Sequence, residues 1–99
     1  MPRYVLLIKM TNQGAKNIAE KSAPVQIEET TKLLEAAGCK MIDHYIVMGE
    51  YDWVAIFEAP SDEVMMTQLL RMNAAGNFTT TTLKAFTVKE FADMIEKLP

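Results

Sequence analysis

The chain has 99 residues, of which 49% are hydrophobic and 23% are charged, and its formal net charge is -3. This length predicts a single domain over residues 1–99, and the scattered basic residues argue against a nucleic-acid partner. No apolar run reaches the roughly 20 residues that cross a membrane, and no secretion signal is recognisable, so we expect a cytoplasmic protein.

The first half of the chain predicts a strand, a short helix, a long helix and a second strand. Residues 4–10 form a nearly continuous apolar run, which is typical of a strand buried on both faces. After a turn at 11–14, residues 15–20 suit a short helical turn. Ser22 and Pro24 then mark the start of an amphipathic helix that ends at Gly38. The second strand is expected over residues 41–48.

The second half predicts a hairpin, a helix, a strand and a last helix. Residues 49–52 turn the chain and residues 53–58 form a third strand, which a connection this short makes antiparallel to the second. Ser61, followed by acidic residues, starts a helix that Gly76 closes. A strand follows at 78–86, and Thr87 with Glu90 forms the capping box of a C-terminal helix.

This order is βαββαβ plus a helix, which predicts an α+β, ferredoxin-like sandwich with an antiparallel four-stranded sheet. The first and third strands then lie at the centre of the sheet, which suits their apolar sequences. Two helices cover only one face. We expect the other face to be covered by a second copy, as in a dimeric α+β barrel, since such a face supplies the roughly 800 Å² of a stable interface. The alternative cover is the C-terminal helix.

Several short motifs, taken together, make the chain resemble a GYD-domain protein. They are Lys9 with the turn at 11–14, Gly49-Glu50-Tyr51-Asp52, Glu58-Ala59-Pro60, residues 82–87, and Glu90-Phe91. The resemblance runs along nearly the whole chain. It implies a ferredoxin-like, oligomeric domain, and it brings no established catalytic residues.

Four residues are candidates for ligand binding: Tyr51, Asp52, His44 and Lys9. Asp52 beside Tyr51 at a strand mouth suits a polar ligand or a general base, although a turn Asp more often bonds local backbone. His44 is expected to share a strand face with Ile42 and Ile46, where it is either a proton shuttle or a hydrogen-bonded structural residue. Lys9 either pairs with Glu58 across the central strands or forms the polar floor of an anion site.

A metal site is not expected. One histidine and the lone Cys39 are too few ligands for a classical zinc site, a single cysteine forms no intrachain disulfide, and no other cofactor is indicated.

Three functions remain open at this point. The first is a homo-oligomer that binds a small apolar or aromatic molecule between helices and sheet. The second, by analogy of fold alone, is a cofactor-independent monooxygenase or isomerase. The third is a structural or regulatory assembly module. Whether the protein is an enzyme is left undecided by the sequence.

Overall fold

The structure, a computed structural model, describes residues 1–20 and 23–99. In chain order its elements are β1 (Arg3–Met10), α1 (Asn12–Glu20), α2 (Ala23–Ala36), β2 (Lys40–Ile46), β3 (Trp53–Glu58), α3 (Asp62–Ala74), β4 (Phe78–Ala85) and α4 (Val88–Glu96). Every predicted strand and helix is present, and the predicted helical turn belongs to the longer helix α1. The predicted capping residue Ser22 lies outside the described residues.

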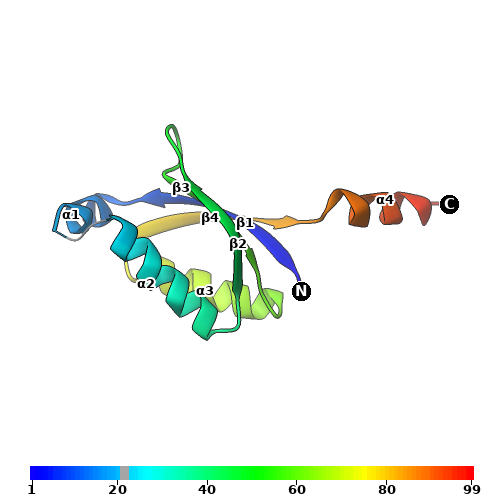
Figure 1. The fold of residues 1–99 in the computed structure, drawn as a ribbon, viewed down its shortest axis with the longest axis horizontal. Coiled ribbons are helices and arrows are strands. Elements are labelled where there is room, and N and C mark those ends of the chain that lie inside the picture. The colour runs from blue at the N-terminus through cyan, green and yellow to red at the C-terminus, as the bar shows by residue number, and fades with distance from the viewer. Residues whose placement is uncertain (21–22) are drawn as a thin grey trace.

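The four strands form one antiparallel sheet in the order β2-β3-β1-β4. The ferredoxin-like prediction is therefore confirmed, with β1 and β3 at the centre. Helices α2 and α3 lie on the same side of this sheet, as Figure 1 shows. The fold thus has one covered face and one open face.

The core lies between the sheet and these two helices. Alternate residues of β1 and β3 point into it, because successive side chains along a strand face opposite ways. The buried apolar residues are Tyr4, Leu6, Ile8, Leu34, Cys39, Trp53, Ala55, Phe57, Ala59, Met65, Met72 and Phe78.

Local sequence signals set the ends of α3 and α4. Ser61 caps α3, its Oγ accepting a hydrogen bond from the Val64 N–H at 3.2 Å. Gly76 follows α3 with a φ of 84°, which favours glycine. The predicted capping box of α4 is present: Thr87 Oγ1 accepts from the Glu90 N–H at 3.0 Å, and Glu90 Oε1 accepts from the Thr87 N–H at 2.9 Å.

A register shift in β2 corrects one sequence prediction. Met41 pairs with Phe57 and Asp43 pairs with Ile56, so Ile42 is an extra residue between them. An extra residue of this kind interrupts the alternation of side chains, so residues before and after it point to the opposite faces from those that strict alternation predicts. His44 therefore shares the covered face with Met41 and Ile46, and Met41 takes the place that the strict alternation gave to Ile42.

The open face of the sheet is largely apolar. Its two central rows, read from β2 to β4, are Tyr45, Val54, Leu7 and Thr81, then Asp43, Ile56, Val5 and Leu83. Val5 and Leu7 are half-buried in the single chain, so the prediction that β1 is buried on both faces is wrong for one copy alone. The cover by a second sheet stays a prediction.

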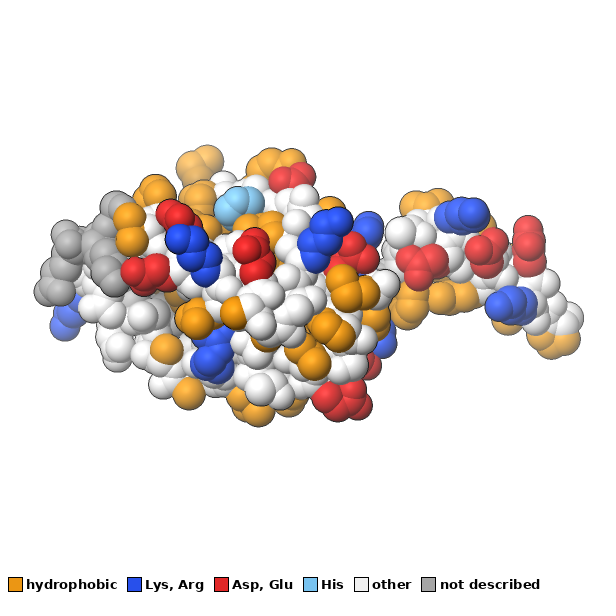
Figure 2. Space-filling model, turned by 60° about the horizontal axis from the view of Figure 1, so that its bottom comes forward, with side chains coloured by type: hydrophobic (Ala, Val, Ile, Leu, Met, Phe, Trp, Pro, Cys, Tyr) orange, Lys and Arg blue, Asp and Glu red, His pale blue; other side chains and the backbone are white. Residues whose placement is uncertain are grey.

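Helix α4 does not cover the open face. It stands beyond the end of β4, clear of the body, in Figure 1, and all nine of its residues are exposed. Figure 2 shows hydrophobic side chains along this arm. The arm stretches the molecule to 56 Å along its longest axis, against 29 Å and 19 Å along the other two.

Candidate functional site

The C-terminal end of β1 is held by Asp52 of the β2–β3 hairpin. Asp52 donates its backbone N–H to the Ile8 carbonyl at 2.9 Å, and its Oδ2 accepts from the Met10 N–H at 2.8 Å. The β1–β3 ladder ends at the pair of Ile8 and Trp53. The carboxylate of Asp52 therefore takes the place of the next backbone carbonyl, a charge-assisted bond stronger than a neutral one.

The turn after β1 is fastened to the loop after α3. The Thr11 N–H donates to the Asn77 carbonyl at 3.1 Å, and the Thr11 hydroxyl donates to the Gly76 carbonyl at 2.5 Å. Gly14 lies so close that a Cβ there would be 2.1 Å from the Asn77 carbonyl oxygen. Glycine at this position is what allows the two segments to meet.

A cavity of about 90 Å³ opens at this same end of the sheet, beneath α2. Its lining is mainly apolar and comprises Ile8, Met10, Gln26, Ile27, Ile46, Asp52, Trp53 and Phe78. Asp52 is the one charged residue among these described lining residues. The rings of Trp53 and Phe78 form an aromatic wall, with centroids 6.3 Å apart and planes tilted by 58°.

Gln26 is the buried polar group of this cavity. Its side chain is only 7% exposed, and among the described residues no donor reaches its Oε1. An unpaired buried carbonyl costs free energy, so native proteins rarely leave one without a partner. Gln26 lines the cavity, but its Oε1 is itself buried, and the surface that the cavity presents is apolar.

His44 lies outside the cavity but is linked to it through Trp53. The indole Nε1–H of Trp53 donates to His44 Nδ1 at 3.0 Å, so the neutral imidazole carries its proton on Nε2. His44 instead lines a shallow hollow between α2 and β2, with Ile27 and Met41 among its neighbours. Lys9 is exposed and Tyr51 is half-buried, and neither lines the cavity or this hollow.

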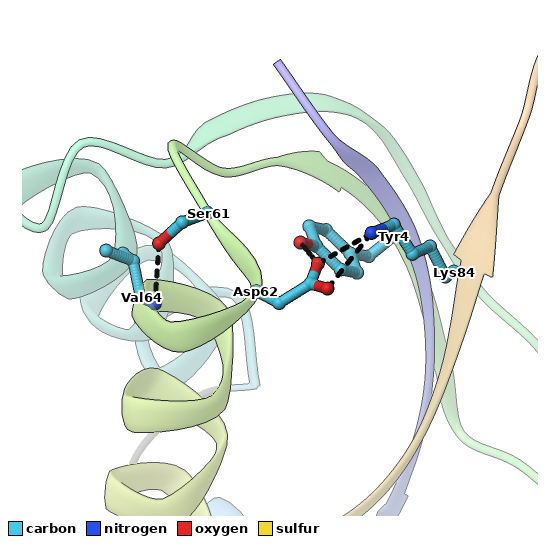
Figure 3. A network of polar contacts seen from close by, with 5 residues as sticks. All are labelled: Tyr4, Ser61, Asp62, Val64 and Lys84. Carbon is cyan, nitrogen blue, oxygen red and sulfur yellow. Dashed lines mark hydrogen bonds and ion pairs between the residues drawn. The ribbon is translucent and has the colours of Figure 1, made fainter.

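A second polar cluster joins the start of α3 to the central sheet. The Tyr4 hydroxyl donates to Asp62 Oδ1, and Lys84 Nζ lies 3.0 Å from both carboxylate oxygens, as Figure 3 shows. Burial, followed by this hydrogen bond, raises the pKa of Tyr4 to about 12. The same hydrogen bond, followed by Lys84, lowers the pKa of Asp62 below its ordinary value.

Comparison with known proteins identifies the family. The family profile described as GYD domain matches residues 4–95. The chain belongs to the GYD domain family. Most of the motifs that mark this GYD domain now have a structural account. Asp52 and the turn that begins at Thr11 hold the end of β1, and Asp52 also lines the cavity.

A curated relative of this GYD domain comes from Thermus thermophilus. It is 31% identical over 99 residues, covering 99% of each chain, and is named "Glutamine synthetase and cystathionine beta-lyase binding protein". In the described part of this GYD domain, three or more His, Cys, Asp or Glu residues nowhere gather in a group that suits a metal ion. No described helix has the length and hydropathy to span a membrane.

The suggested pairing of Lys9 with Glu58 is wrong. The two central strands are antiparallel, which places Glu58 opposite Arg3, at the far end of β1 from Lys9. Glu58 lies 3.8 Å from the Arg3 guanidinium and 3.9 Å from the N-terminal amine. Both contacts are at a partly exposed site, where ion pairs contribute little to stability.

Sequence reasoning missed Gln26, although a signal for it exists. Gln26, Thr30 and Leu34 follow one another at intervals of four, which places them on one helix face, and Leu34 is fully buried. The signal is easily missed because Gln26 is polar, so a search for apolar positions along this helix passes over it. A polar residue on a buried stripe is the observation that points to a site.

Proposed function

We propose that this GYD domain is a protein-docking module that pairs with a second copy and presents α4 to a partner enzyme. The observation that carries this proposal is the exposed apolar stripe of α4. Its members are Val88, Phe91, Met94 and Ile95, continued by Leu98 just beyond the helix, and each is at least 42% exposed.

Helix α4 has a defined start, but none of its residues is buried. A capping box fixes its start, yet isolated helices shorter than about 12 residues are marginal in water. Apolar anchors at intervals of three and four are the pattern with which amphipathic helices bind hydrophobic grooves. A partner with an apolar groove would therefore stabilise α4 by covering its apolar stripe.

The name of the Thermus thermophilus relative supports an enzyme as that partner, because that protein is named for binding two metabolic enzymes. The stripe on α4 supplies apolar anchors, and Lys89, Asp93 and Lys97 add charged groups to the arm. This combination of apolar centre and charged rim resembles ordinary protein interfaces.

The test is complex formation with purified enzymes. The chain is mixed with glutamine synthetase, and separately with cystathionine beta-lyase, of its own organism, and each mixture is analysed by size-exclusion chromatography with light scattering. We expect a complex with at least one enzyme. Phe91→Asp, which charges the centre of the stripe, should weaken it by at least about tenfold, since interface anchors often contribute 2 kcal/mol or more.

A matched control separates docking from general damage. Leu33 on α2 is 52% exposed, close to the 58% of Phe91, so Leu33→Asp introduces the same charge on another helix. It should leave the complex intact. Failure of both enzymes to bind, or equal loss in the two variants, would contradict the proposed role of α4.

Self-association is assigned to the open face. Four strands of seven residues cover a flat area on the order of 400 Å². The side chains on this face add accessible surface, which brings the total toward the ~800 Å² per partner that is usual for a stable interface. Soluble monomers rarely leave an apolar patch of this size uncovered. A second copy offers the same face and covers both at once.

Binding of a small apolar or aromatic molecule is a second candidate function. The cavity beneath α2 supports it, because an apolar lining with a few polar groups is the usual composition of a ligand site. Titration of small aromatic molecules, followed by the signal of Trp53, tests this function. Trp53 lines the cavity and is the only tryptophan in the chain.

A further inference from the structure

The two edges of the sheet differ in how they are protected against pairing. β2 forms one edge, and it carries Lys40, Asp43 and the extra residue Ile42. Charges and bulges of this kind are the usual protection of an edge strand. β4 forms the other edge, contains no proline, and stays in register with β1 along all eight of its residues. Its one charged side chain, Lys84, is paired with Asp62. An unprotected edge of this length is a template for another strand.

We propose that β4 pairs with the β4 strand of a second copy, antiparallel and around a two-fold axis at Thr81, while the two α3 helices pack beside this joint. This contact uses the edge of the sheet and not its open face, so it goes beyond the proposed function. It joins the two four-stranded sheets into one continuous sheet.

The register of β4 on β1 determines which of its backbone groups point outward. The pair of Met10 and Phe78 is followed by a hydrogen bond from the Thr11 N–H to the Asn77 carbonyl, at 3.1 Å. Since the direction of hydrogen bonding alternates along an antiparallel strand, the odd-numbered residues of β4 bond to β1. The even-numbered residues direct their N–H and C=O groups outward, and they are Phe78, Thr80, Thr82 and Lys84.

These four residues are self-complementary in one antiparallel register. With the two-fold axis at Thr81, Thr80 lies opposite Thr82 of the second copy, and Phe78 lies opposite its Lys84. Each such pair exchanges two hydrogen bonds, so every outward backbone group of these residues gains a partner. Thr–Thr pairs across strands are favourable. No like charges lie opposite each other, because Lys84 is the only charged residue of β4.

Helix α3 supplies an apolar stripe beside the same edge. It packs against β4, and its Asn73 Nδ2 donates to Thr80 Oγ1 at 2.9 Å. Met66, Leu69, Leu70 and Asn73 follow the i, i+3, i+4 and i+7 spacing of one helix face, and Met66 and Leu70 are 57% and 61% exposed. Met66 and Leu69 border a shallow hollow that β4 also lines. When β4 meets its copy, the two α3 stripes therefore meet and cover each other.

The size of this contact makes it the weaker of the two proposed self-contacts. Eight residues of strand are about 27 Å long and the layers of sheet and helix are about 20 Å high, which gives roughly 500 Å² on each copy. The total of about 1,000 Å² is at the lower limit for a specific interface. We expect a dissociation constant on the order of 100 µM, so dilute protein keeps only the open-face pair.

Sedimentation velocity over a concentration series tests the pairing on the full chain. The wild-type mass should rise as the concentration passes ~100 µM. Leu70→Lys puts a charge in the α3 stripe and should move this rise to a concentration at least about tenfold higher. Leu33→Lys on α2 introduces the same charge at a similarly exposed position, 52% against 61%, and should leave the rise unchanged. A constant wild-type mass, or equal weakening by both variants, would overturn the inference.

Residue-resolved amide exchange tests the register. In dilute protein the amides of Thr80 and Thr82 should exchange quickly and that of Thr81 slowly, because only Thr81 bonds to β1. Concentrated protein should protect Thr80 and Thr82, and association that leaves both unprotected would overturn the pairing. Thr80→Pro removes an outward N–H but no hydrogen bond of the β1–β4 ladder, so it should weaken association as Leu70→Lys does. If Thr80→Pro fails to fold, Leu70→Lys and the wild-type exchange decide the matter.

Leu7→Lys separates this inference from the pairing of open faces. Leu7 lies on the open face, away from the edge, so this variant should go from monomer to dimer in concentrated protein and stop there. Growth of Leu7→Lys beyond a dimer would contradict a two-fold contact. If open faces do not pair, the wild type shows the same single step and the edge contact stands. Protection of Thr80 and Thr82 by an added enzyme, without any rise in mass of the chain alone, would assign the edge to an extended segment of that enzyme instead.

Discussion

Replacing Asp52 with alanine tests whether this family-marking residue fastens the backbone. Its Oδ2 accepts the Met10 N–H at 2.8 Å, where the β1–β3 ladder has already ended. Alanine leaves that N–H without its acceptor at a half-buried position. A hydrogen bond to a charged group contributes about 1.5–3 kcal/mol, and the partial exposure of the site favours the lower end, about 1.5–2 kcal/mol.

For a domain of this length, each 1 kcal/mol lowers the melting temperature by about 4–8 °C, so the expected loss is about 6–16 °C. Urea unfolding and differential scanning calorimetry measure the two quantities. Asp52→Asn keeps an oxygen acceptor without the charge and should lose only about 0.5–1 kcal/mol. Asp93→Ala, on exposed α4, serves as the control and should change stability by less than about 0.5 kcal/mol.

Two results would refute this reasoning. One is a loss below about 0.5 kcal/mol in Asp52→Ala, close to the ordinary effect of a surface substitution. The other is an equal loss in Asp52→Ala and Asp52→Asn, which would show that the acceptor oxygen is not what matters. Either result would mean that the hydrogen bond to the Met10 N–H does not explain the presence of Asp52, and that this residue needs a functional explanation.

Three further predictions concern the sheet and its neighbours. The pKa of Tyr4 is raised from 10.0 to about 12. The contribution of its neutral hydroxyl to stability is therefore complete below pH 10 and lost as the pH rises to 12. An absorbance titration of the tyrosines should show this late step, and Tyr4→Phe should abolish it. Gly14→Ala places a Cβ 2.1 Å from the Asn77 carbonyl oxygen and should cost about 1–3 kcal/mol, with an unchanged unfolding midpoint arguing against the close contact. Leu7→Lys puts a charge at the centre of the open face and should convert a dimer to a monomer in light scattering. Leu33→Lys, on α2, should leave the dimer intact. A wild-type protein that is itself a monomer would refute the pairing of two copies through the open face.

The fold was predictable because its signals are local and agree with one another. Ser61 and the pair of Thr87 and Glu90 cap helices where expected. The βαββαβ order places β1 at the centre of the sheet. The alternation of side chains along β1 then divides its residues between the two faces of the sheet. Local capping, strand periodicity and topology all support one architecture here.

The candidate site was less predictable because it depends on pairing between distant segments. The extra residue Ile42 changes which side chains accompany His44, and no sequence signal marks a bulge at this place. Lys9 and Glu58 were compared without a register, although antiparallel pairing separates them. Asp52 was recognised as important, but its partner, the Met10 N–H, is a backbone group that no side-chain pattern reveals.

Hydrogen–deuterium exchange on the enzyme complex tests the docking role of α4 most directly. In the free chain the amides of residues 88–96 should exchange quickly, because none of the residues of this helix is buried. We expect saturating glutamine synthetase or cystathionine beta-lyase to slow exchange over 88–96 while α2 is unchanged. A saturated complex in which 88–96 still exchanges as quickly as in the free chain would contradict the account.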